Sequence, residues 1–239
     1  MNDHRVWKTA RPVATLRQGR NDWFRIENKA GTPEVFIYDE IGYFGVTAAD
    51  FVKELQKIDT DRLTLHLNTP GGEAFDGIAI YTALSAHPAA VDVVVDSLAA
   101  SAGSLIAQAG DTVTMTRNAQ MMIHDAGGMV IGNAVDMAEM AAVLDKLSDN
   151  IADIYSQRAG GTVESWRDLM RAETWFSADE AVEAGLADTV QGKSTETKNS
   201  WDLSIYSYAG RAQAPDPVLP TPDPYDTDSV VADLERAFA

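Results

Sequence analysis

The sequence predicts an α/β fold built on a largely parallel sheet. Two observations lead to this prediction. Short apolar strand patterns alternate with amphipathic helical patterns through residues 31–190, as right-handed βαβ crossovers require. In addition, 45% of the 239 residues are hydrophobic, which is enough for one large core or two modest ones. We therefore expect strand and helix to follow each other in repeated crossover units.

The first unit begins with a short buried strand at residues 35–38. Thr47 is a suitable N-cap for a helix that runs to about Ile58, because apolar residues then recur at helical spacing. Leucines alternate at positions 63, 65 and 67 and predict the next strand. The helix that follows must end before Pro88, because proline disfavours helical backbone in the residue before it.

The third unit has a strand at residues 91–95 and a helix that opens at Ser101. Further strands are expected at Val113 and at residues 121–123. Because the strands of a parallel sheet end at one edge, residues that follow them can meet there.

One predicted helix is much longer than the others. Asn133 is a good N-cap with Asp136 three residues on, and Gly160-Gly161 end the apolar pattern. At about 1.5 Å per residue the helix is roughly 40 Å long. Its apolar stripe exceeds what one small domain needs to cover, so we expect part of the helix to contact another subunit. The alternative is a long core helix.

The composition divides the chain into three parts. Residues 1–30 form an N-terminal arm, residues 31–190 form the domain, and residues 191–239 are polar and rich in proline. Such a segment gains little from burial, so it is predicted to be a flexible acidic tail. Within it, residues 228–239 could form a short amphipathic helix.

Charge and cysteine content exclude several classes of protein. The net charge of −17 makes nucleic acid an unsuitable partner. The chain has no cysteine, which rules out disulfides and thiol chemistry. No apolar run approaches the roughly 20 residues that span a bilayer, and the first residues do not resemble a signal peptide. We expect a cytoplasmic protein, or a component of a particle made in the cytoplasm, without membrane contact.

Ser101 and His124 are the residues most suited to catalysis. Ser101 lies among alanines and a glycine where strand passes into helix, so nothing bulky shields its hydroxyl. His124 closes the apolar strand at residues 121–123. Serine becomes a nucleophile when a base takes its proton, and histidine is the usual base near neutral pH.

Ser104 is the alternative serine, but a helix cap or a packed hydroxyl explains it. The turn Pro70-Gly71-Gly72 could direct backbone N–H groups at an oxyanion, so the pattern points to acyl transfer, most simply peptide hydrolysis.

Four ordered motifs give the chain a family resemblance. They are Asn68-Thr69-Pro70-Gly71-Gly72, Ala99-Ala100-Ser101-Ala102-Gly103, Met122-Ile123-His124 and residues 175–188, WFSADEAVEAGLAD. From about residue 34 to 190 the chain resembles the Clp protease proteolytic subunit. The stretch at 37–47, IYDEIGYFGVT, is similar to the phage and prophage branch, the Clp-related head maturation proteases.

The resemblance implies a crotonase-like fold in which the long helix is a protruding, handle-type helix. It also implies a homo-oligomeric ring that encloses serine protease sites acting on proteins or peptides. It implies Ser101 as nucleophile, His124 as general base, and the amides of Gly72 and Ala102 as the oxyanion hole. No cofactor or metal ion is expected. For the phage branch it also implies a place in the prohead, with capsid or scaffold proteins, or an unfoldase, as partners.

The third triad residue departs from the family pattern. Glu173 stands where the Clp subunits have an aspartate, and its extra methylene changes the reach. Asp168 is a second candidate, and Asp125 a weaker one because it adjoins His124. Glu173 could also be a solvated acid on a loop.

Two other functions are compatible with the same fold. One is a crotonase-type acyl-CoA enzyme, which would use acidic residues and does not need the ordered serine and histidine. The other is a catalytically silent shell or scaffold protein. A signal-peptide-peptidase-like enzyme would need a catalytic lysine, and there is none between Lys57 and Lys146.

Overall fold

The computed structural model of the chain describes residues 24–29, 32–42, 45–192 and 201–220. Within these ranges one eight-stranded sheet has the order β1-β2-β3-β4-β5-β8, and β6 pairs with both β4 and β7. The strands are β1 (Phe24–Lys29), β2 (Thr32–Ile37), β3 (Arg62–Thr69), β4 (Ala90–Ala100), β5 (Thr112–Thr116), β6 (Gln120–Ile123), β7 (Thr174–Ser177) and β8 (Thr189–Gln191).

The sheet is mostly parallel, which confirms the predicted fold class. Pairs β2–β3, β3–β4, β4–β5, β4–β6 and β5–β8 are parallel, whereas β1–β2 and β6–β7 are antiparallel. The helices are α1 (Ala48–Leu55), α2 (Ala74–Ser85), α3 (Ala102–Ala107), α4 (Ala134–Ala159), α5 (Val163–Arg171) and α6 (Ala178–Glu183), and a 3₁₀ turn η1 spans Arg211–Gln213. The Thr47 side chain caps α1 as predicted, although α1 ends at Leu55, three residues earlier than expected.

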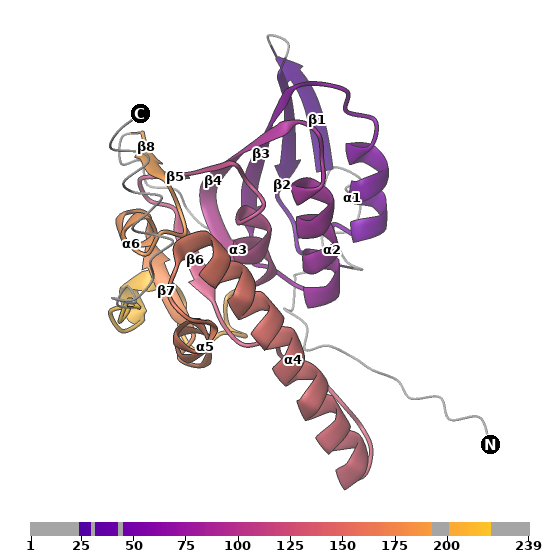
Figure 1. The fold of residues 1–239 in the computed structure, drawn as a ribbon. Helices are drawn as coiled ribbons and strands as arrows, with labels where there is room; N and C mark the ends of the chain where they lie inside the picture. The colour runs from indigo at the N-terminus through magenta and orange to yellow at the C-terminus, as the bar shows by residue number, and fades with distance from the viewer. Residues whose placement is uncertain (1–23, 30–31, 43–44, 193–200, 221–239) are drawn as a thin grey trace, which may run out of the picture.

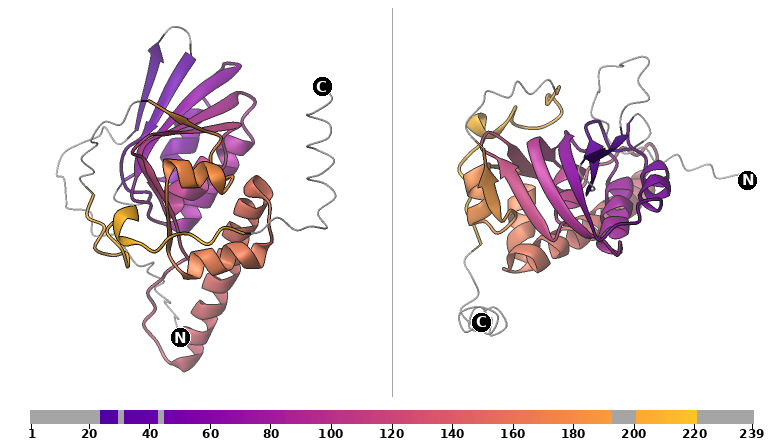
Figure 2. Two further views of the ribbon diagram at one scale, coloured as in Figure 1. Left: turned by 90° about the vertical axis from the view of Figure 1, so that its left-hand side faces the viewer. Right: turned by 90° about the horizontal axis from the view of Figure 1, so that it is seen from above.

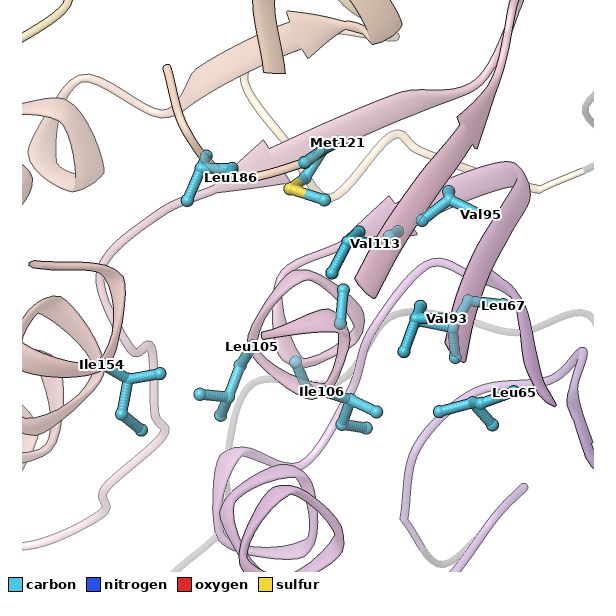
Figure 3. Close-up of a cluster of buried hydrophobic side chains, with 14 of the residues drawn as sticks. Leu65, Leu67, Val93, Val95, Leu105, Ile106, Val113, Met121, Ile154 and Leu186 are labelled. Atoms are coloured by element: carbon cyan, nitrogen blue, oxygen red, sulfur yellow. The ribbon is translucent and has the colours of Figure 1, made fainter. Parts of the chain in front are cut away.

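The main core lies between the helices and one face of the sheet. Alternate residues of β3 are buried, so Leu65 and Leu67 point into this core beside Val93 and Val95 of β4 (Figure 3). Leu105 and Ile106 of α3 meet them from the helical side. Burial of these side chains fixes the register of β3 and β4, since a shift by one residue would turn each apolar set away from the core.

Helix α4 extends well beyond the body of the domain (Figure 1). It has the predicted Asn133–Asp136 capping box and spans 26 residues. Its second half is anchored by buried residues such as Ile151 and Tyr155, whereas Val135 and Met137 in its first half are 64% and 52% exposed. The handle-type helix predicted from the sequence is therefore present.

The second face of the sheet carries a smaller core. The end of β4 is buried on both sides, and Leu98 and Ala100 pack there with Met122, Trp175 and Tyr206. Residues 201–220, which we call the C-terminal strap, supply the cover through Trp201, Leu203, Tyr206, Tyr208 and Ala214. In Figures 1 and 2 the strap is the gold segment near β7 and α6.

The strap differs from the free tail expected after residue 190. Over 201–220 the chain packs against the sheet, because its aromatic residues cover apolar side chains that β4, β6 and β7 leave on that face. The expected boundary itself stays a prediction. The N-terminal arm up to residue 23, residues 193–200 and the amphipathic stretch at 228–239 lie outside the described residues.

Candidate active site

Ser101 occupies the junction between β4 and α3 in a left-handed backbone conformation. Its φ is 53° and its ψ is −120°, which is costly for a residue that has a Cβ. The surroundings hold it there: the Ser101 N–H donates to the Met122 carbonyl at 2.9 Å, and the Ser101 carbonyl accepts from the Ser104 amide at 3.0 Å. The residue is only partly buried, so a sharp turn presents its hydroxyl at the start of a helix.

Ser104 has a different environment. It is fully buried, and its hydroxyl lies 2.6 Å from the Ser101 carbonyl and 2.8 Å from the Tyr155 hydroxyl. These contacts fit the packed hydroxyl that the sequence offered as the alternative to catalysis.

His124 lies directly beside Ser101. Strand β6 pairs in parallel with β4, with Ala100 opposite Met122, so the residue that follows each strand reaches the same edge of the sheet. His124 Nε2 is 2.7 Å from Ser101 Oγ. The two residues singled out from the sequence are thus within hydrogen-bond distance.

The environment of His124 favours its neutral form. Burial lowers the pKa of His124 below its usual 6.5, and the charges of Glu173 and Asp125 oppose that shift. A neutral imidazole at neutral pH can accept a proton from the serine hydroxyl. The pair therefore has the geometry and the protonation state of a nucleophile and its base.

The structure separates the three candidate acids. In the antiparallel ladder between β6 and β7, Ile123 is opposite Thr174, so the next residues along, His124 and Glu173, face each other just beyond the ladder. Glu173 has a positive φ of 49°, and its charge acts on the imidazole. The contact is electrostatic, because no hydrogen bond joins Glu173 to His124 within the described ranges.

Asp168 and Asp125 form ion pairs with arginines and not with His124. The Asp168 side chain is 71% exposed and pairs with Arg171. Asp125 uses both carboxylate oxygens to bind the buried Arg167, at 3.2 Å to Nε and 3.2 Å to Nη2. Arg167 also binds Asp145 and Asp149 of α4, so this cluster ties the loop after His124 to the handle helix.

The glycine turn lies against the nucleophile. Gly71 has φ +92°, and a Cβ there would come within 2.6 Å of both Ala100 O and Ser101 Cβ. Neighbouring residues hold the turn, since the Ile41 N–H donates to Gly71 O at 2.8 Å and the Glu73 N–H to Ile41 O at 2.9 Å. In the described part of the chain, neither Gly72 N–H nor Ala102 N–H has a backbone acceptor in a loop or turn. The assignment of these two amides to an oxyanion hole stays a prediction.

Tyr206 is the site residue that the sequence interpretation missed. Its ring lies edge-on to His124, with centroids 5.4 Å apart, and its hydroxyl donates to the Pro70 carbonyl. A signal was present in the sequence: the ends of β4 and β6 and the middle of β7 are apolar on both faces, which requires a second cover. The aromatic residues at 201, 206 and 208 could have supplied it.

The described residues contain no cluster of metal-ligating side chains. No group of three His, Cys, Asp or Glu side chains in these ranges could hold a metal ion. None of the helices in the same ranges combines the length and hydropathy that a bilayer span requires.

Comparisons with known proteins agree with this geometry. The profile of the Clp protease family matches residues 23–194. The ATP-dependent Clp protease proteolytic subunit of Deinococcus radiodurans is 29% identical over 157 residues, which cover 63% of this chain and 77% of that protein. Subunit 1 from Chlamydia abortus is 30% identical over 152 residues, covering 60% and 79%. The chain belongs to the Clp protease family, whose members are serine endopeptidases.

Proposed function

We propose that the chain hydrolyses peptide bonds with Ser101 as nucleophile, His124 as general base and Glu173 as the third triad residue. The observation that carries the proposal is the 2.7 Å separation of His124 Nε2 and Ser101 Oγ. It is strengthened by the strained backbone of Ser101, because strain of this kind is typically retained at functional sites.

The proposed reaction proceeds through an acyl-enzyme. As Ser101 Oγ attacks the scissile carbonyl carbon, its proton passes to His124 Nε2. The amides of Gly72 and Ala102 stabilise the negative charge that develops on the carbonyl oxygen. The imidazolium then gives its proton to the leaving amine, and a water molecule repeats the sequence to release the acid. Glu173 stabilises the imidazolium through its charge.

A fluorophosphonate probe tests the nucleophile. We expect one phosphonyl group per chain, bound to Ser101 and located by mass spectrometry after proteolysis. Ser101→Ala should abolish labelling and lower peptide hydrolysis by several orders of magnitude, because triad residues act as a unit. Ser104→Ala is the matched control and should still be labelled. Labelling of Ser101→Ala to the wild-type extent would contradict the assignment, and an unreactive wild type would leave the silent shell protein as the better interpretation.

We further propose that the chain forms a homo-oligomeric ring and uses the first half of α4 to contact another subunit. Val135, Met137 and Val143 on that helix are 64%, 52% and 44% exposed, and Met129 and Ile131 in the preceding loop are 51% and 86% exposed. Apolar side chains gathered on a projecting element commonly mark a protein interface. Light scattering at micromolar concentration should give a mass of several subunits, and a monomer with full activity would refute this.

The proposed biological setting rests on one sequence stretch and on the names of the relatives. The similarity of residues 37–47 to the phage branch supports head maturation in the cytoplasm or the prohead, with capsid or scaffold proteins as substrates. The names of the relatives, ATP-dependent proteolytic subunits, support an unfoldase as the alternative partner. Cleavage of purified capsid or scaffold protein without ATP would favour the first partner class.

A further inference from the structure

We infer that the C-terminal strap is a working part of this active site: Tyr206 positions His124 and the glycine turn, and the strap backbone positions Glu173. The inference rests on the proposed function. The strap lies beyond residue 194, where the match to the Clp protease family ends. The contacts described below therefore involve residues outside the part of the chain that matches the family.

The strap backbone fixes the Glu173 carboxylate. The Ser207 N–H donates to Glu173 Oε2 at 2.8 Å, and the Tyr208 N–H donates to Glu173 Oε1 at 3.0 Å. The Trp175 indole N–H adds a third bond at 3.2 Å to Oε1. Two of the three donors that hold this carboxylate therefore come from the strap. Glutamate has one more rotatable bond than aspartate, so it needs such fixing more than the shorter acid would.

Tyr206 contacts the other two parts of the site. Its hydroxyl donates to the Pro70 carbonyl, which fixes the peptide plane at the entry to the glycine turn. Its ring lies edge-on to the His124 ring, and edge-on to Trp175 at 6.1 Å between centroids. One side chain thus spans the oxyanion turn and the general base. Burial raises the pKa of the Tyr206 phenol, and its interaction with the Ser101 side chain opposes that shift.

The strap is anchored at both ends of this contact. The Trp201 indole N–H donates to Asn68 Oδ1 at 3.0 Å, next to the glycine turn. Beyond Tyr208, the Arg211 side chain binds both carboxylate oxygens of Glu180, at 2.6 and 2.5 Å. These anchors lie on β3 and α6, so the segment between them is held across the site.

Positioning explains the arrangement better than occlusion does. A segment that blocked the site would bury the nucleophile, yet Ser101 remains partly exposed with the strap in place. Tyr206, in contrast, is only 8% exposed. It is therefore a buried residue that packs beside the active site.

Replacement of Tyr206 should alter the pKa of His124. The groups that act on His124 are Ser101 Oγ on its Nε2 side, Glu173 before β7, Asp125 in its own loop and Tyr206 on the strap. The charge of Glu40 acts on Tyr206. Of these, Tyr206 supplies apolar cover, and the two acids favour the charged imidazole. Removal of the Tyr206 ring therefore admits water and raises the His124 pKa toward 6.5.

The rate at which a fluorophosphonate labels Ser101 between pH 5 and 9 tests the inference on the full chain. In wild type we expect this rate to rise through an acidic limb, as His124 loses its proton, to a plateau at higher pH. Tyr206→Phe keeps the ring, so the pH of its acidic limb should match wild type. It loses the hydrogen bond to Pro70, so its plateau rate should fall about 10-fold, the value of one hydrogen bond. Tyr206→Ala should lower the plateau further and move the acidic limb to higher pH. Ile205→Ala is the control on the same strap, because Ile205 is 41% exposed, and it should behave as wild type.

Each other result overturns the inference. If both Tyr206 variants have the plateau rate and the acidic limb of wild type, the strap has no positioning role. Faster labelling of Tyr206→Ala at every pH would mean that the strap occludes the site. A lower plateau in all three variants with unmoved limbs would indicate a merely structural role. Should the alanine variant fail to fold by circular dichroism, the plateau of Tyr206→Phe decides alone. An unlabelled wild type would overturn the proposed function as well, which distinguishes the two failures.

Discussion

Replacement of Arg211 by glutamine should weaken the docking of the strap in a pH-dependent way. Arg211 binds Glu180 through two short hydrogen bonds and reaches Asp216 with a third at 2.6 Å. The Arg211 and Glu180 side chains are 17% and 25% exposed, so water screens their attraction only in part. Glutamine keeps much of the length of the side chain and removes its charge.

The magnitude follows from the pKa of Glu180. Hydrogen bonding to Arg211, together with the helix-cap bond from Ser177, lowers this pKa from 4.5 to about 2, while burial opposes the shift. At about 1.36 kcal/mol per pH unit the difference corresponds to an upper bound of roughly 3–4 kcal/mol. Part of it belongs to the helix cap and part is lost to screening, so we expect Arg211→Gln to cost about 1–2 kcal/mol near pH 7.

The sign of the pH dependence is fixed by the same linkage. Because the folded state lowers the Glu180 pKa, the stabilisation is fully present above about 4.5 and is lost as the pH falls toward 2. Urea unfolding of wild type should therefore show a loss of free energy of unfolding between pH 5 and 2. In Arg211→Gln this loss should be smaller, and at pH 7 the melting temperature should be roughly 2–8 °C lower.

Arg171→Gln provides the matched control. Arg171 pairs with Glu164 and Asp168, but its side chain is 46% exposed and theirs are 72% and 71% exposed. Exposed pairs of this kind contribute little, so this variant should unfold like wild type. Equal pH profiles for wild type and Arg211→Gln, or equal losses in both arginine variants, would refute the reasoning.

Three further predictions concern the site and the assembly. Glu173→Gln should lower turnover by about 10⁴ with the fold intact, as loss of a triad carboxylate does; a near-normal rate, with Asp168→Asn inactive, would assign the role to the other acid. Gly71→Ala should abolish fluorophosphonate labelling because its Cβ would collide with the nucleophile, whereas Gly160→Ala, with a similar positive φ and nothing within 4 Å, should react normally; normal labelling of both would contradict the close approach. Val143→Glu should dissociate the assembly by light scattering and keep its circular dichroism, and an unchanged mass would exclude this part of α4 from the interface.

Much of the fold was predictable because it depends on local patterns. Alternating leucines in β3, the Thr47 cap and the Asn133 capping box each act within a few residues. The same holds for Ser101 and His124, because each stands at the end of an apolar strand, and strand ends of a parallel sheet share one edge. Leu147 shows the limit of a periodic pattern: it lies on the apolar stripe of α4, yet it is 7% exposed and belongs to the core, while Val143 one turn earlier is 44% exposed.

The sequence by itself determined the alternation of strands and helices, the sharp turn at Ser101, and the histidine that can serve it. Only the tertiary structure decided which acid faces His124, because that depends on the register of β6 against β7. It alone also brought Tyr206 to Pro70, a contact between residues 136 positions apart. Such a contact has no local signature. It forms because the ends of β4 and β6, together with Trp175 of β7, leave an apolar face to be covered. Which later segment covers that face is settled only when the whole sheet is assembled.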